Sequence, residues 1–332
     1  MTEISIQRQV IRAGPRFGVS FQRTLRIPDD GQTYPLPPGL GSFPVFAVAD
    51  FKERLPEDWS PEDAFIPVYQ REAVWLAFHG TKWKPNAVQV RVGGVSALTG
   101  ETGDQPLKAE PQNYLVTAAQ PWLDGIVSGT GMVRQFVAMP LGLGYTVEAA
   151  VTGAERRGAI GLRVYEPKPG IFPDEEPASP EGSPPRAAAG IQPMGLGAGG
   201  KMKQKIYRDP HGVEVWDPRE FADVTIHLLN SAQFREVTGL EPPGTPVDAA
   251  AYAEAGLPWF DLYDEHLAAL DPAAVLANAK TIAQRDEERG IDPAQLPEID
   301  VRRLPVKTRA TDPGPGGKKQ PGAAFPSNPA ES

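Results

Sequence analysis

Polar and aromatic residues gather among glycines between positions 120 and 136 of the chain. Trp122, Asp124, Arg134 and Gln135 supply an indole ring, a carboxylate, a guanidinium and an amide, which together could hold a small ligand. Binding residues tend to lie on loops that a rigid sheet positions. We therefore predict a ligand-binding loop surface around these four residues. The alternative is structural: Asp124 closes a turn, and Arg134 pairs with a neighbouring acid.

A second cluster combines carboxylates with an imidazole, in the order Asp261, Asp264, Glu265 and His266. Such groups can perform acid–base chemistry or bind a divalent metal when the fold brings them together. On a helix, Asp261 and Glu265 share a face, whereas Asp264 and His266 do not join them well. The enzymatic hypothesis is a hydrolase-like protein acting on a polar metabolite or carbohydrate, with Asp124 joining this cluster in space. The alternative is a solvated helix face.

A glycine-rich run at 195–200 precedes three alternating lysines, Lys201, Lys203 and Lys205. Consecutive glycines can expose backbone N–H groups to an anion, and alternate residues of a strand project on one face. The run matches neither G-x-x-x-x-G-K-[ST] nor a G-x-G-x-x-G that opens a helix. A flexible hinge is therefore the preferred interpretation, with anion binding as the alternative.

Other catalytic and cofactor chemistry has no motif in the chain. His79, His211 and His227 are far apart and lie in no H-x-x-x-H pattern, so we interpret them as isolated core or surface residues. The absence of cysteine excludes disulfides, thiolate metal sites and a cysteine nucleophile. No G-x-S-x-G sequence is present for a serine hydrolase. We predict no metal and no cofactor.

The composition of the chain favours a β-rich fold as the framework that positions these candidate residues. The 332 residues include 37 prolines and 34 glycines, which disfavour long helices and favour short strands joined by turns. The predicted fold is α+β and mainly β, with an antiparallel β-sandwich or barrel-like core and a few C-terminal helices. Alternating segments that predict strands occur at 4–10, 19–25, 114–117, 133–139, 145–151 and 159–165.

Composition divides the chain into four parts. Residues 1–165 form the strand-rich core, and the proline-dense residues 166–200 are predicted to be a disordered linker or insertion. Residues 201–305 complete the core with strands and add helices, while residues 306–332 form a disordered tail. Capping residues and terminal glycines place these helices at 231–239, 245–256 and 273–289.

The formal net charge of -9 repels nucleic-acid phosphate and anionic lipid, so neither is an expected partner. No segment approaches the roughly 18 uninterrupted apolar residues of a membrane helix, and the first residues lack a secretory signal pattern. We therefore predict a cytoplasmic protein. The preferred hypothesis is a non-enzymatic binding or scaffold protein whose partner is another protein or a small polar ligand. A subunit that uses its proline-rich segments as tethers is a third hypothesis.

The middle block, with QPWLDGI at 120–126 and RQFVAMPLGLGYTVE at 134–148, resembles an uncharacterised family of hypothetical proteins from bacteria and fungi. The similarity extends to residues 29–45, 69–76 and 199–207, so it spans most of the chain before the tail. This resemblance implies no activity, cofactor or catalytic residue. Members are sometimes labelled membrane proteins, but the sequence contains no segment that supports that label.

Overall fold

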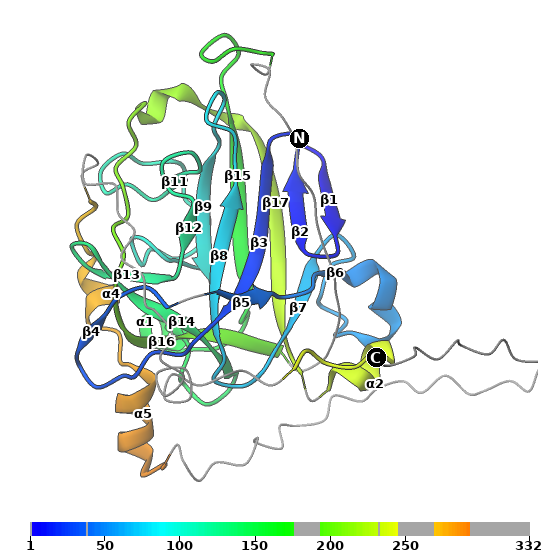
Figure 1. Ribbon diagram of the computed structural model, residues 1–332, viewed down its shortest axis with the longest axis vertical. Helices are drawn as coiled ribbons and strands as arrows, with labels where there is room; N and C mark the ends of the chain where they lie inside the picture. The colour runs from blue at the N-terminus through cyan, green and yellow to red at the C-terminus, as the bar shows by residue number, and fades with distance from the viewer. Residues whose placement is uncertain (1, 38, 176–192, 232, 245–268, 293–332) are drawn as a thin grey trace, which may run out of the picture.

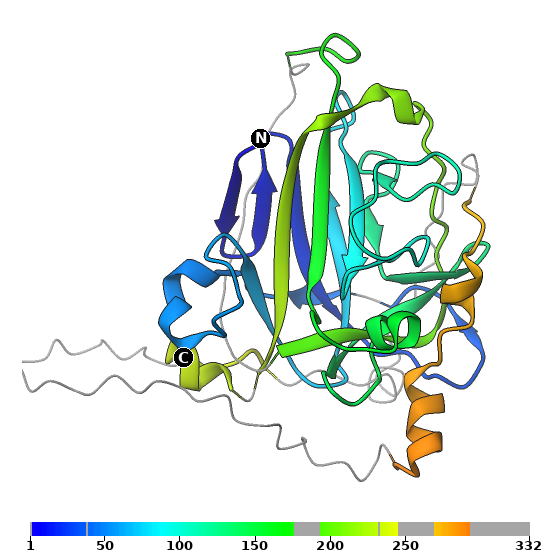
Figure 2. The ribbon, with the colours of Figure 1, turned by 180° about the vertical axis from the view of Figure 1, so that it is seen from behind.

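The computed structural model describes residues 2–37, 39–175, 193–231, 233–244 and 269–292. These residues form an α+β fold that is mainly β and has its longest helix near the C-terminal end, as the sequence predicts. Long curved strands lie side by side through the centre, with loops and helices at their ends and flanks (Figures 1 and 2).

All strands of the described residues belong to one hydrogen-bonded sheet. In chain order they are β1 (Ile4–Gln7), β2 (Val10–Ala13), β3 (Phe17–Thr24), β4 (Thr33–Tyr34), β5 (Gly39–Ser42), β6 (Phe46–Ala47), β7 (Ala64–Val68), β8 (Ala73–His79), β9 (Ala87–Val92), β10 (Val95–Ser96), β11 (Leu115–Val116), β12 (Trp122–Leu123), β13 (Gly125–Gly129), β14 (Met132–Pro140), β15 (Ile160–Pro167), β16 (Pro193–Lys203) and β17 (Trp216–Asn230). The helical segments of the same residues are η1 (Val48–Arg54), α1 (Val147–Thr152), η2 (Val213–Val215), α2 (Phe234–Thr238), α4 (Ala274–Ala277) and α5 (Ile282–Arg289).

Two runs of paired strands make up most of the sheet. The first is β1-β2-β3-β8-β14-β16, and the second is β9-β15-β17-β7. They join where the start of β16 pairs with the end of β17. Most pairs are antiparallel, but β4–β16 and β7–β17 are parallel. Because the largest apolar core takes buried side chains from both runs, the runs pack around a shared interior; examples are Phe21, Val90, Phe136 and Val224.

Alternation in the sequence locates several strands correctly. Residues 133–139 lie in β14, residues 160–165 lie in β15 and residues 19–24 lie in β3. The single strand predicted at 4–10 is wrong in part, because residues 8–9 form the turn between β1 and β2. The strand predicted at 145–151 is wrong, because most of it forms α1. Thr146 begins this helix by accepting a hydrogen bond from Ala149 N on its hydroxyl, and Gly153 ends it at φ 75°.

The linker predicted at 166–200 is wrong at both of its ends. Residues 166–167 finish β15, and residues 193–200 begin β16, which pairs with β14 for most of its length. Glycine is required where the chain approaches a neighbour closely, since a Cβ on Gly200 would stand 2.1 Å from the carbonyl oxygen of Pro28. The flexible hinge predicted at 195–200 is therefore wrong as well. Residues 176–192 lie outside the described part of the chain.

The C-terminal helices are shorter than the sequence predicts. The predicted 231–239 helix contains α2, and the predicted 273–289 helix is divided into α4 and α5. The division occurs because a capping box at Thr281 starts α5 as a separate helix. The Thr281 hydroxyl accepts from Gln284 N, and the Gln284 side chain accepts from Thr281 N. The predicted 245–256 helix and the predicted tail lie outside the described residues.

Candidate functional site

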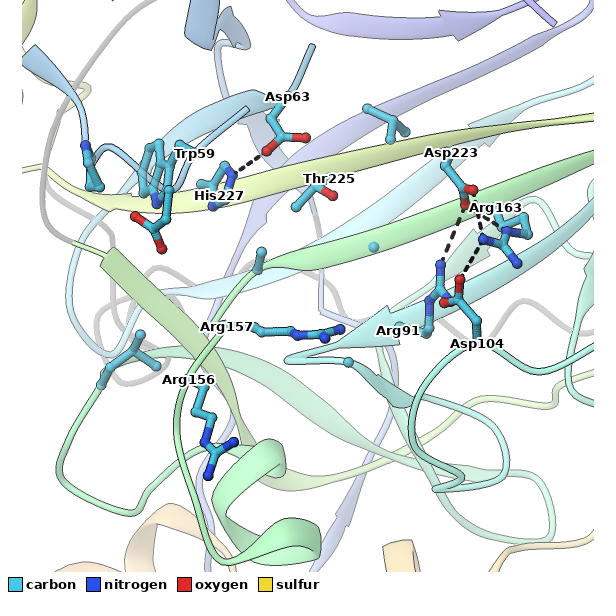
Figure 3. A pocket seen from close by; sticks show the side chains of 17 residues that line it. Trp59, Asp63, Arg91, Asp104, Arg156, Arg157, Arg163, Asp223, Thr225 and His227 are labelled. Carbon is cyan, nitrogen blue, oxygen red and sulfur yellow. Dashed lines mark hydrogen bonds and ion pairs between the residues drawn. The ribbon is translucent and has the colours of Figure 1, made fainter. Parts of the chain in front are cut away.

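A concavity with a volume of about 560 Å³ lies over one face of β9, β15 and β17 (Figure 3). Alternate residues of a strand project on the same side, so Asp223, Thr225 and His227 of β17 all line it. Gly161 of β15 pairs with Thr225 on one side and with Arg91 of β9 on the other. Because glycine has no side chain, the middle of this floor stays open.

One end of the floor is an ion-pair network of two arginines and two aspartates. Arg163 donates to both carboxylate oxygens of Asp223 at 2.7 Å and to Asp104 Oδ2 at 2.8 Å. Arg91 also pairs with Asp104, and its Nη2 lies 3.5 Å from Asp223 Oδ1. Burial alone would raise the pKa of Asp104, but the hydrogen bond from Arg163 and the charge of Arg91 hold it below its usual value. These two arginines are thus neutralised within the protein.

The rim carries two further arginines, Arg156 and Arg157, on the loop after α1. The buried Glu148 of α1 fixes this loop, because its Oε2 accepts from Arg156 N at 3.1 Å, from Arg157 N at 3.1 Å and from Gly158 N at 3.4 Å. Both side chains are exposed, and neither guanidinium has a polar partner among the described residues. Figure 3 shows Arg157 extending across the concavity toward Arg91, with Arg156 at its edge.

The other end holds a histidine between an aspartate and a tryptophan (Figure 3). His227 Nε2 lies 2.9 Å from Asp63 Oδ2. The Trp59 indole stacks on the imidazole, with ring centroids 3.9 Å apart and planes 8° apart. An ionised carboxylate only accepts hydrogen bonds, so Nε2 donates, and in the neutral imidazole the lone pair therefore lies on Nδ1. The Nδ1 atom has no partner within the described part of the chain, and the His227 side chain keeps 11% of its exposure.

The parallel pairing of β7 with β17 brings this histidine and aspartate together. Phe65 of β7 pairs with His227, and Asp63 directly precedes that strand. Trp59 is 5% exposed and belongs to a small apolar cluster with Leu55 and Phe65, which holds the loop between η1 and β7. The imidazole is therefore fixed both in its plane and in its hydrogen bonding.

Charge around the concavity divides into paired and open groups. Four arginines and four aspartates line it, so its formal charge is balanced. Apart from the ion-pair network and the Asp63–His227 pair, the charged lining consists of Arg156, Arg157 and Asp58, for which the described residues provide no partner. Two open cations against one open anion favour a ligand that carries an anionic group.

The residues predicted from the sequence lie elsewhere. Trp122 is half-buried on β12, and the structure places Asp124, Arg134 and Gln135 in the interior, not on a loop surface. That surface location is wrong because β14, which contains Arg134 and Gln135, lies between β8, β13 and β16 in the sheet and is covered by other segments. None of the four residues lines the concavity. Ligand binding by them stays a prediction.

Each of these buried polar side chains bonds to a nearby part of the protein. Gln204 donates to Asp124 Oδ2 at 2.6 Å and accepts from Asp124 N at 2.9 Å. Gln135 accepts from Ile27 N at 3.0 Å and donates to the Leu25 carbonyl at 2.8 Å. Arg134 donates to the carbonyl oxygens of residues 277 and 279, beside α4. Burial raises the pKa of Asp124 to about 7, although the hydrogen bond from Gln204 opposes this.

The remaining candidates have different outcomes. Asp261, Asp264, Glu265 and His266 lie outside the described residues. Anion binding by the lysines after the glycine run stays a prediction. The interpretation of His227 as an isolated residue did not connect it to Asp63, because the two residues are 164 positions apart and no local pattern joins them. The only available signal was the alternation of polar residues 223, 225 and 227, which predicts one shared face.

Comparison of the chain with known proteins identified no related protein. No family model matches the chain, and neither curated proteins nor solved structures give a match. The family resemblance of the middle block therefore stays a prediction. Within the described ranges, no helix combines the length and the apolar character needed to cross a membrane. The same residues contain no group of three or more histidine, aspartate or glutamate side chains placed to hold a metal ion.

Proposed function

We propose that this chain is a binding protein for a small polar ligand, and that the ligand's phosphate or carboxylate group is held by Arg157 and Arg156 in the concavity. The proposal keeps the preferred hypothesis from the sequence, a binding protein, but moves its site to the face of β9, β15 and β17. The cavity volume of about 560 Å³ is within the range of small-molecule sites.

The observation that carries the proposal is the contrast between the arginines of the concavity. Arg91 and Arg163 are neutralised by Asp104 and Asp223, whereas Arg157 extends across the same floor with no partner among the described residues. A guanidinium presents several donors in a planar fork that fits the oxygens of a phosphate or carboxylate.

The backbone around these two arginines is already ordered. Glu148 holds three consecutive N–H groups of the loop, and Glu155 accepts from Gly144 N at 2.8 Å and from Thr146 N at 3.0 Å. A ligand therefore has to order only the arginine side chains and not the loop. Preorganisation of this kind lowers the entropic cost of binding.

Titration of the full chain with inorganic phosphate, followed by calorimetry and by thermal shift, tests the proposal. We expect phosphate to raise the melting temperature, because a ligand of the native state stabilises it. The double variant Arg156→Met, Arg157→Met should bind phosphate at least about tenfold more weakly, since each charge-assisted hydrogen bond is worth roughly 1.5 to 3 kcal/mol. Arg219→Met is the matched control, because Arg219 is an exposed arginine of β17 outside the concavity.

A second variant blocks the concavity without removing a charge. A Cβ on Gly161 would meet Arg91 Nε at 3.5 Å, an ordinary contact, and the residue is not in the left-handed region. Gly161→Leu should therefore fold and fill the floor. Equal phosphate affinity in wild type, in the double arginine variant and in Gly161→Leu would refute a site at this position.

A further inference from the structure

We propose that the concavity is also catalytic: His227, oriented by Asp63, acts as a general base in the hydrolysis of a phosphate monoester held by Arg157 and Arg156. This inference rests on the proposed function, because the same arginines bind the phosphate group. It assigns a role to a buried histidine that anion binding alone does not use.

The contacts of the imidazole fit proton transfer. Asp63 accepts from Nε2, which fixes the neutral tautomer that has its lone pair on Nδ1, and Trp59 fixes the plane of the ring. A histidine oriented by a carboxylate is the arrangement that activates a nucleophile in many hydrolases. Nδ1 has no partner among the described residues, and His227 lines the same concavity as the two open arginines.

Burial also separates His227 from an ordinary surface histidine. It is 8% exposed, whereas His79 is exposed and bonds Ser20 at 2.8 Å across neighbouring strands. One nitrogen of this imidazole bonds Asp63 and the other has no partner among the described residues, so a molecule in the concavity that His227 lines can bond the second nitrogen.

The reaction balances with water as the only co-substrate. Nδ1 of His227 accepts a proton from a water molecule while the water oxygen forms a bond to phosphorus and the ester P–O bond breaks. The leaving alkoxide takes a proton from solvent water and the imidazole returns its proton to solvent, which gives an alcohol and inorganic phosphate. Arg157 and Arg156 stay bonded to the non-bridging oxygens and stabilise the charge that they carry in the transition state.

A phosphate monoester fits better than a carboxylic ester for a specific reason. The reacting centre of a monoester is itself anionic, so the arginines that bind the substrate also hold the atoms that react. The carbonyl of a carboxylic ester is neutral before attack, and an arginine pair would gain less by binding it.

Two measurements on the full chain separate this inference from the proposed function: phosphate affinity by calorimetry, and turnover of p-nitrophenyl phosphate. We expect wild type to release p-nitrophenol above the buffer rate. His227→Gln keeps a donor for Asp63 but cannot take up a proton, so kcat should fall by about 100-fold with phosphate affinity unchanged. His79→Gln is the control and should keep both.

Asp63→Asn tests the orienting role. Asp63 Oδ2 also accepts from Ser60 N at 3.0 Å, so the asparagine should keep an oxygen at this position and still accept from Nε2. The variant loses the negative charge, and the neutral amide stabilises the imidazolium formed on proton uptake less than the carboxylate does. A lower kcat with unchanged KM and an unchanged melting temperature would support positioning. Full turnover by His227→Gln would overturn the inference, and so would phosphate binding by wild type without any hydrolysis. In both cases the binding proposal would survive, whereas failure to bind phosphate would remove both.

Discussion

Asp124 is a fully buried carboxylate in the centre of the β-rich core, and its burial should make the stability of the protein depend on pH. The side chain is 3% exposed, and burial raises its pKa from an ordinary 3.8 to about 7. A raised pKa means that the folded state prefers the protonated form. The favourable contribution is therefore complete below the unfolded pKa of about 3.8, declines as pH rises, and is lost above about 7.

The size of the effect follows from the pKa difference. About three pKa units at 1.36 kcal/mol each correspond to about 4 kcal/mol. Between these two pKa values, the free energy of unfolding should fall by about 1.4 kcal/mol for each unit of pH. Relaxation around the ionised group would reduce the total, so about 4 kcal/mol is an upper value.

Asp124→Asn removes the ionisable group but keeps a carbonyl oxygen to accept from Gln204 Nε2. We expect the variant to be more stable than wild type near pH 8, by up to about 4 kcal/mol, and to lose this advantage near pH 4. Urea unfolding followed by tryptophan fluorescence at several pH values measures this difference. Asp50→Asn, at an exposed aspartate of η1, is the control and should leave the profile of wild type unchanged. Parallel pH profiles for wild type and Asp124→Asn would show that the buried carboxylate is not the cause.

Two further predictions concern packing. Asp286 of α5 is 2% exposed and accepts two hydrogen bonds from Arg71, both at 2.8 Å. Asp286→Ala should therefore lower the free energy of unfolding by about 3 kcal/mol, measured by urea titration. Glu287→Ala, at an exposed position of the same helix, is the control and should unfold like wild type. Burial opposes ionisation of Asp286, but Arg71 lowers its pKa below 3.8, so its contribution should persist above about pH 4 and disappear only as pH falls further. Gly200→Ala should destabilise the fold by several kcal/mol, because the new Cβ would collide with the Pro28 carbonyl oxygen. Gly244→Ala is the control and should not destabilise it, because a Cβ there would have no atom within 4 Å. A melting temperature of Gly200→Ala equal to that of wild type would contradict this close approach.

Alternation of apolar and polar side chains predicted the strands that contain few glycines. In β15, buried and partly buried residues alternate at 160–163, and this strand was predicted from the sequence at 159–165. β16 was missed because its glycines give no alternating pattern, and its place in the sheet is fixed by how closely other backbone approaches it. The segment at 145–151 satisfied both periodicities, and the cap at Thr146 decided for a helix. Local sequence therefore predicts strand content better than strand limits.

The candidate site was harder to predict, because residue type does not say whether a polar group faces inward or outward. Arg134 and Gln135 were chosen for their chemistry, yet their hydrogen bonds hold the segment at 25–27 and the end of α4 against β14. A buried polar side chain without such partners would cost free energy, so a central strand tolerates arginine and glutamine where they bond neighbouring backbone.

The opposite holds for the concavity. No local sequence pattern marks Arg157 as a binding residue. Glu148 fixes the loop that carries it, and the aspartates of the concavity neutralise Arg91 and Arg163 but do not pair with Arg157. Those relations join residues from β9, α1, β15 and β17, so they exist only in the folded chain. A polar residue therefore indicates a binding site when the fold leaves its hydrogen-bonding groups without partners inside a cavity, and this is the property that distinguishes Arg157 from Arg134.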